Sequence, residues 1–481
     1  MKRSPRRRTA RSALVLLLLI SSIAARAEGG KPVELDIGRA QELAREGSEE
    51  VLAKEAAAEA ALRSVDAARA SLFPKLSGNL SGAFLPQPPA GVIVPAGTLG
   101  TLPLYNPRTS SIDYLPMPAT QLDVGEYTKD SYFKGSLTFT QPIVAWGKIK
   151  AAIDLASMEA HVASIGSAGA SLDAVRSANR AYYSAVLSRE SIVIIEELRA
   201  LAASIQEDRK SAAIEGFATQ EDLLSSTADL AALDTRLVQA REGEASALEA
   251  LGVLTRLDAS SLLLVSRFRE TLPPLPETEL KDEAARAFTD VEVARARLSQ
   301  ARRKVDLERG SSLFLPDLSF FASIEALGQD VPFSSPSWWA NTWSWDLSLG
   351  LSASVDLFDG GASAARKREA AAGLEAARVG EGAAEKAARL QARRAIETAR
   401  EAEAALREKE ARAAWAAEAL RNARAKAAGQ AVSRAELDAQ AIGEATARLD
   451  LLYARYALEE ALADLERVVG KELRAEGEAP R

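Results

Sequence analysis

Two long stretches of the chain contain no proline, and this feature constrains its fold more than any other. The stretches are residues 143–272 and 337–479. Both are rich in Ala, Glu, Arg and Leu, which stabilise helices well, whereas a proline inside a helix would break it. Within them, segments 148–215 and 362–428 are each followed by a glycine, and at 1.5 Å per residue each would form a helix ~100 Å long if continuous. Helices of that length exceed what a globular domain requires.

A turn and a second helix follow each long segment. A glycine ends the first helix and is expected to supply the positive φ of the helix end. A hydroxyl residue then begins the next helix, and an acidic residue three positions later forms a capping box, complete in the second turn and approximated in the first, where Asp replaces Glu. Leucines spaced by seven in the outgoing helices are typical of coiled-coil packing. Each half therefore contains a predicted helical hairpin, with turns at Gly216, Thr219 and Asp222 and at Gly429, Ser433 and Glu436.

The two halves of the chain share one plan. Each opens with a helix, over 35–72 and 280–312, continues through a strand-rich segment and ends in the long hairpin. The register is consistent, because Gly147 recurs 213 residues later as Gly360. Internal repetition of this kind usually decides an architecture. We therefore predict a first structural repeat over 28–275 and a second over 276–481, each with a helix, two strands and a long helical hairpin. They follow a signal peptide over 1–27, which the pattern of the first residues indicates.

Outside the helices, four segments alternate between apolar and polar residues. They cover residues 75–84, 133–140, 317–325 and 344–356. Such alternation is typical of a membrane barrel strand, and also of a soluble sheet with one wet face. Nearby tryptophans suit the aromatic girdle of a barrel, which favours the membrane alternative. These candidate girdle residues are Trp338, Trp339, Trp343 and Trp345.

Four strands are too few to close a barrel, since the smallest bacterial barrels have eight. An open sheet edge is not tolerated in lipid, so several copies must combine. Two copies would give eight strands and an interior filled by side chains, whereas three would give twelve strands and a lumen. We therefore expect a homotrimer.

The first residues have the pattern of a secretory signal peptide. A basic start, an apolar run over 13–20 and the sequence Ala25-Arg26-Ala27 predict cleavage after residue 27. The apolar run is too short to span a membrane, and no later segment is apolar enough for a transmembrane helix. Removal of the leader's seven basic residues changes the net charge from −7 to −14, which excludes a nucleic-acid binder. The protein is expected to be exported, and any membrane it crosses must be crossed by strands.

The composition argues against an enzyme. The chain has no cysteine and one histidine, His161, which excludes disulfides, cysteine nucleophiles and multi-histidine metal sites. His161 lies in a helical run without a nearby serine motif, so we expect an ordinary helix residue. The segment 145–148 lacks the upstream glycines of a phosphate loop. No catalytic residue, cofactor or metal is predicted.

Short fragments lie in order over essentially the whole mature chain: 33–40, 72–74, 139–143, 181–187, 314–316 and 355–361, together with the two helical turns. Together they resemble the TolC-like outer-membrane efflux protein family. The resemblance implies a mainly α protein with membrane β, whose long α-helical hairpins form a tunnel and whose four β-strands per chain contribute to a trimeric 12-stranded β-barrel. It also implies an outer-membrane exit duct of a Gram-negative-type bacterium, serving a tripartite efflux or type I secretion system through a periplasmic adaptor and an inner-membrane transporter.

The helical turns are the expected gate of such a passive duct. Relatives place acidic rings at this constriction, so the resemblance implies a ring from Asp222, Glu436, Asp438 and Glu221. Threefold symmetry would triple each carboxylate and attract cations. The alternative for Asp222 and Glu436 is that they only cap their helices. We expect the adaptor to contact Gly216, Thr219, Gly429 and Ser433.

Three features depart from the family pattern. No cysteine follows the leader, so the lipid anchor of some relatives is absent. The proline-rich segment 85–125 predicts an enlarged extracellular loop. The glycine expected to close the second helix, Gly252, also falls about four residues earlier than its counterpart Gly470. A periplasmic adaptor or a coiled-coil structural protein of an export complex remains the alternative, although the tryptophan-rich strands have no role in the latter.

Overall fold

The computed structural model divides the chain into two compact units, each drawn from both halves of the sequence. The helical unit contains the described parts of 1–61, 158–299 and 375–481, and the sheet unit those of 62–157 and 300–374. The predicted leader, Trp338 and Trp339 lie outside the described residues. The structure describes residues 33–84, 92–108, 111–122, 131–269, 273–310, 316–329, 343–355, 358–429, 431–471 and 473.

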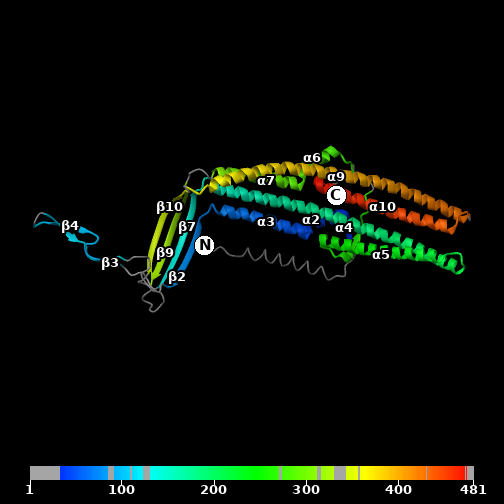
Figure 1. Cartoon of the computed structure of the whole chain (residues 1–481), viewed down its shortest axis with the longest axis horizontal. Helices are drawn as coiled ribbons and strands as arrows, with labels where there is room; N and C mark the ends of the chain where they lie inside the picture. The colour runs from blue at the N-terminus through cyan, green and yellow to red at the C-terminus, as the bar shows by residue number, and fades with distance from the viewer. Residues whose placement is uncertain are drawn as a thin grey trace, which may run out of the picture. The chain divides into compact units, whose positions relative to one another are not determined.

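Four antiparallel strands form the main sheet of the sheet unit, in the order β10-β9-β7-β2 (Figure 1). The four segments predicted as strands are all present. Their register aligns apolar residues on one face, as in the row Leu137, Ile324 and Leu347, and polar residues on the other, as in the row Thr138, Ser323 and Ser348. The strands are β2 (Lys75–Phe84), β7 (Ser131–Val144), β9 (Asp317–Gln329) and β10 (Trp343–Ser354).

The proline-rich segment expected to be a loop contains four further strands. β3 pairs with β6 and β4 with β5, both antiparallel. The prediction missed them because apolar side chains occupy both faces of the β4–β5 ladder, so polarity does not alternate along the sequence. The strands are β3 (Val92–Val94), β4 (Thr101–Asn106), β5 (Ser111–Pro116) and β6 (Thr120–Leu122).

Two helical hairpins have matching dimensions (Figure 1). The incoming helices α4 (Lys148–Ile214) and α9 (Ala362–Ala428) have 67 residues each, and the outgoing helices α5 (Gln220–Thr255) and α10 (Arg434–Val469) have 36 each. Ion pairs join the arms of each hairpin, such as Arg199–Asp234 at 2.5 Å. Among the described residues, no helix combines the length and apolarity needed to cross a bilayer.

Each predicted opening helix is in fact two helices. The first is interrupted at Ser48, whose backbone is extended and whose hydroxyl accepts a hydrogen bond from the Val51 amide at 3.3 Å. The second is interrupted at Phe288, also extended. A side-chain acceptor that begins a new helix competes with continuation of the old one. The four helices are α2 (Ile37–Gly47), α3 (Glu49–Ala70), α6 (Glu277–Ala287) and α7 (Thr289–Gly310).

A buried tyrosine organises the core of the helical unit. Tyr182 has no exposed surface; its hydroxyl donates to the Leu35 carbonyl at 2.9 Å and accepts from the Ser266 amide at 2.8 Å. These bonds hold the parallel pair β1 (Val33–Leu35) and β8 (Leu262–Leu264) against α4. The fragments 33–40 and 181–187 are therefore parts of one hydrogen-bonded core.

The two outgoing helices end at equivalent positions, and Gly252 is not one of them. Gly470 caps α10 in the left-handed conformation, with φ 76°, and Arg256 caps α5 at the same distance from its turn, with φ 59°. Gly252 lies inside α5, so its predicted role as the helix end was wrong. A Cβ there would lie 2.9 Å from the Leu257 carbonyl oxygen. Gly252 is thus required by close packing of the chain that follows the helix.

Candidate functional site: the helical turns

The first turn is closed by bonds from both helices. Gly216 has φ 80°, and the Phe217 amide donates to the Ala212 carbonyl at 2.8 Å, which ends α4 in the predicted way. Thr219 then caps α5. Its Oγ1 accepts from the Asp222 amide at 3.2 Å, and Asp222 Oδ2 accepts from the Thr219 amide at 3.0 Å and from its hydroxyl at 2.6 Å. The capping box is therefore complete in the first turn, although Asp replaces Glu.

The second turn has only half of this arrangement. Ser433 Oγ accepts from the Glu436 amide at 3.2 Å, but within the described residues the Glu436 carboxylate makes no bond back to Ser433. The expectation of a complete box here was wrong. Gly429 also lacks the predicted positive φ; α9 ends with bonds from the amides of Gly429 and Ala431 to the Lys426 carbonyl.

The structure distinguishes the four acidic candidates by their partners. The hydrogen bonds from Thr219 lower the pKa of Asp222. The carboxylate is therefore stabilised in its ionised form, in which it accepts the capping hydrogen bonds. Glu221 and Glu436 are exposed and Asp438 is half-buried. None of these three carboxylates makes a hydrogen bond or ion pair within the described part of the chain. Capping thus accounts for Asp222, and the predicted acidic ring at the turns stays a prediction for the other three carboxylates.

A cross-hairpin ion pair lies close to the turns. Arg434 at the start of α10 contacts Asp208 of α4, with Nη2 3.0 Å from Oδ2, and donates to Ser204 Oγ at 3.2 Å. This contact was not predicted from the sequence, although the sequence contains one signal of it. A cation in the first turn of a helix is disfavoured by the helix dipole, so Arg434 requires an acidic partner elsewhere. The bond ties the second hairpin to the first near the predicted gate.

The first turn also exposes large apolar side chains. Ile214 is 88% exposed and Phe217 is 85% exposed. At the second turn, Val432 is half-buried. Exposed apolar side chains of this size are typical of surfaces that contact another protein.

Two of the four residues predicted for an aromatic girdle, Trp343 and Trp345, lie on β10 within the described residues. Trp345 is exposed, whereas Trp343 covers Gly328 and packs edge-on against Phe133, with ring centroids 6.0 Å apart. Both lie in the apolar rows of the sheet register. They therefore occupy the face that a girdle requires.

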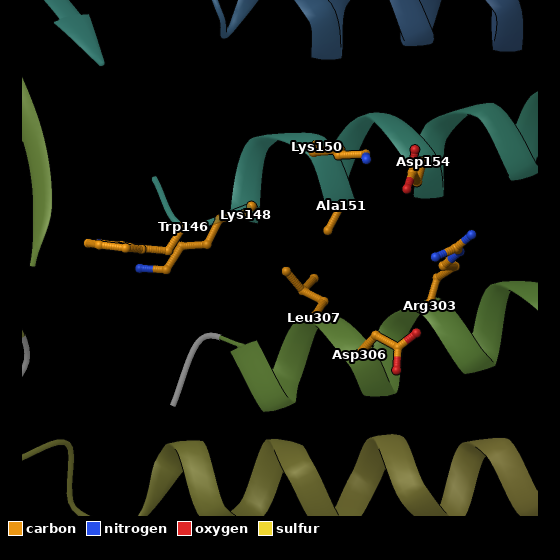
Figure 2. Close-up of a pocket in the computed structure, with 9 residues that line it drawn as sticks. Trp146, Lys148, Lys150, Ala151, Asp154, Arg303, Asp306 and Leu307 are labelled. Carbon is orange, nitrogen blue, oxygen red and sulfur yellow. The ribbon is translucent and has the colours of Figure 1, made fainter. Parts of the chain in front are cut away.

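A cavity of about 240 Å³ lies in the sheet unit between the start of α4 and the end of α7 (Figure 2). Its charged lining is mixed: Lys148, Lys150 and Arg303 with Asp154 and Asp306. Lys148 Nζ lies 2.7 Å from an oxygen of Asp317. Among the described residues, no group of three or more His, Asp or Glu side chains is placed to hold a metal. This lining has no nucleophile paired with a base, and His161 lies exposed elsewhere on α4.

Comparisons with known proteins agree with this geometry. Residues 41–255 match the model of a family described as outer membrane efflux protein. Solved structures share the fold: a membrane protein from Pseudomonas aeruginosa (16% identity, TM-score 0.66, 92% of each chain covered) and the CmeC outer membrane channel of Campylobacter jejuni (16%, 0.65, 92% of this chain and 87% of that chain). The outer membrane protein VceC of Vibrio cholerae is also similar (17%, 0.62, 91% and 97%). None of the curated proteins matched the sequence. The predicted resemblance and fold class are confirmed.

Proposed function

Because residues 41–255 belong to the outer membrane efflux protein family, we propose that this chain is an outer-membrane exit duct of an efflux or secretion system. The observation that carries the proposal is the four-stranded sheet, with one apolar and one polar face and with free edges at β2 and β10. The apolar face meets lipid and the polar face lines a wet lumen. The duct moves solutes passively and performs no bond chemistry.

Three copies complete the duct. Lipid does not tolerate a free strand edge, so β10 of one copy pairs with β2 of the next. Twelve strands then enclose a lumen, and the helical hairpins continue it as a tunnel through the periplasm. An adaptor or a coiled-coil structural protein has no use for a sheet with one exposed apolar face.

The test of this proposal is the location and mass of the protein. We expect co-fractionation with the outer membrane, a trimer mass in detergent and ion conduction in planar bilayers. A stable monomer in the periplasmic fraction would overturn the proposal.

The free carboxylates at the tip make the closed end cation-selective. Replacing Glu436 with Gln and Asp438 with Asn removes two charges per chain, six per trimer, from a narrow mouth. We expect the reversal potential in a salt gradient to move toward that of a non-selective pore. Asp222→Asn is the matched control, because that carboxylate already serves its cap; it should loosen the turn with a smaller effect on selectivity. An unchanged reversal potential in the double variant would contradict a role of these two carboxylates in cation selectivity.

A periplasmic adaptor docks on the first turn, and the inner-membrane transporter is reached through it. The exposed side chains of Phe217 and Ile214 support this docking position. Burying a phenylalanine side chain contributes about 1.5–3 kcal/mol, so Phe217→Ser should weaken docking roughly tenfold or more. Photocrosslinking from position 220 in the native periplasm measures the yield. Ala218→Ser adds the same hydroxyl but removes little apolar surface, and should leave the yield unchanged; an equal loss in both variants would exclude an apolar contact.

A further inference from the structure

The described part of the insert between β2 and β7 has a surface to which the proposed function assigns no role. It is called the arm here and comprises residues 92–108 and 111–122. It consists of the ladders β3–β6 and β4–β5. β2 begins at Lys75, directly after the helix α3, so its far end at Phe84 points away from the helices. In the proposed duct the arm therefore lies on the extracellular side.

The register of the β4–β5 ladder divides its side chains into two faces. One, called here the tyrosine face, carries no charge and consists of prolines, tyrosines, an isoleucine and a threonine. Tyr105 and Tyr114 are each 67% exposed. The opposite face has Leu102, Leu104 and Leu115, together with a hydrogen bond at 2.7 Å from Asn106 to Asp113. The tyrosine face comprises Thr101, Pro103, Tyr105, Ile112, Tyr114 and Pro116.

Prolines block the edges of this ladder. The Met117 amide donates to the Gly100 carbonyl at 3.0 Å, so the Gly100–Met117 pair is hydrogen-bonded and the next pair, Thr101–Pro116, is not. The same alternation makes Pro103–Tyr114 a non-hydrogen-bonded pair. The nitrogens of Pro103 and Pro116 therefore point outward, where proline has no N–H to offer. Each edge therefore lacks one of its outward N–H donors, which disfavours the addition of a further strand and favours a partner that covers a face.

The arm also needs such a partner. An isolated two-stranded ladder is marginally stable in water, and exposed aromatic side chains beside prolines form an apolar patch. Among the described residues of the arm, the only charged ones are Arg108 and Asp113, and neither lies on the tyrosine face. The occupant of that face is therefore uncharged and apolar.

We propose that the tyrosine face of each arm packs against the tyrosine faces of the other two copies. This inference rests on the proposed trimer. The arm follows β2 in the sequence, and β2 is the edge strand where neighbouring copies join, so each arm is connected to a strand at the seam between copies. Threefold symmetry brings three identical uncharged surfaces around one axis, and the contact is self-complementary without any ion pair. The three arms form a cap over the extracellular mouth of the duct.

Cysteine crosslinking tests the cap, because the natural chain contains no cysteine. Tyr105→Cys places a thiol on the tyrosine face, and Leu104→Cys places one on the opposite face of the same strand. We expect oxidation of the purified trimer to link Tyr105→Cys chains into disulfide dimers, with at most two of every three chains linked, because the third copy has no partner left. Leu104→Cys should stay unlinked and react with a membrane-impermeant maleimide. Tyr114→Cys and a flexible bismaleimide repeat the test without the strict geometry of a disulfide.

Two outcomes would overturn the cap. Rapid maleimide labelling of Tyr105→Cys in an intact trimer would mean that its face is open to water. Protection from the maleimide without crosslinking by either route would mean that lipid or a foreign protein covers the face. The trimer mass is measured on the same samples, so that loss of the trimer counts against the proposed function, and an intact trimer with an uncapped mouth counts against the arm contact alone.

Discussion

Replacing Arg269 with Met should destabilise the helical unit by about 3–5 kcal/mol, the cost of removing one partner from a buried ion pair. Arg269 Nε lies 3.2 Å from Glu459 Oε2 and Nη2 lies 3.3 Å from Glu466 Oε1. Glu459 is only 4% exposed, and it also accepts the Arg269 backbone N–H at 2.7 Å. Without the guanidinium, two carboxylates are left in a low-dielectric interior. Urea unfolding followed by circular dichroism, at fixed protein concentration, measures the loss.

The deficit should depend on pH. Burial raises the pKa of Glu459 above its ordinary value, and loss of Arg269 raises it further. A group whose pKa is higher in the folded state contributes stability below its unfolded pKa and loses it as the pH rises through the folded pKa. The variant should therefore be least stable at neutral pH and recover part of its deficit below the ordinary carboxylate pKa.

A matched arginine controls for the loss of charge. Arg176 pairs with Asp464 of the same helix α10, but both side chains are half-exposed. Exposed pairs contribute about 0–1 kcal/mol, so Arg176→Met should cost no more than that. Equal losses in the two variants, or a pH-independent loss for Arg269→Met, would contradict the buried-charge explanation.

The second large effect concerns the apolar face of the sheet. Ile324 lies near the middle of β9, is 47% exposed and stands in a row with Leu137 and Leu347. If that face meets lipid, Ile324→Arg places a charge near the bilayer midplane at a cost of about 2–4 kcal/mol. We expect a lower denaturant midpoint for folding into phospholipid vesicles and fewer trimers in the outer membrane.

The neighbouring residue gives the control. Ser323 lies on the polar face, in a row with Thr138 and Ser348. Ser323→Arg adds the same side chain to the wet lumen and should fold nearly as well as the natural chain, with its effect confined to ion selectivity. Greater damage from Ser323→Arg than from Ile324→Arg would mean that the two faces had been assigned the wrong way round.

Local signals in the sequence were sufficient for the long helices and the four main strands. The predicted segment 362–428 has the bounds of α9, and 148–215 differs from α4 by one residue. Helix propensity, a capping hydroxyl and period-two alternation act within a few residues, so they can be read without knowing the tertiary structure. The turn of the first hairpin followed the same rules.

Contacts between distant residues could not be predicted in this way. Arg269 and Glu459 are 190 residues apart, and no local pattern marks them as partners. Arg434 and Asp208 belong to different hairpins and meet only in the folded unit. Gly252 was mistaken for a helix end because close approach of Leu257 and a left-handed cap both favour glycine. The strands of the arm were missed because alternation of polarity disappears when both faces are apolar.

The equal lengths of the two hairpins, combined with their unequal turns, affect how a partner assembles on the proposed trimer. Both hairpins have helices of 67 and 36 residues, so the six hairpin turns of the proposed trimer are preceded by helices of equal length. Only three of these turns carry Phe217 and a complete capping box. A partner that contacts all six turns of the proposed trimer would thus meet an exposed phenylalanine at three of them and none at the other three. Partner subunits would bind the three turns with Phe217 at low partner concentration and the other three at higher concentration. The binding isotherm would then have two steps.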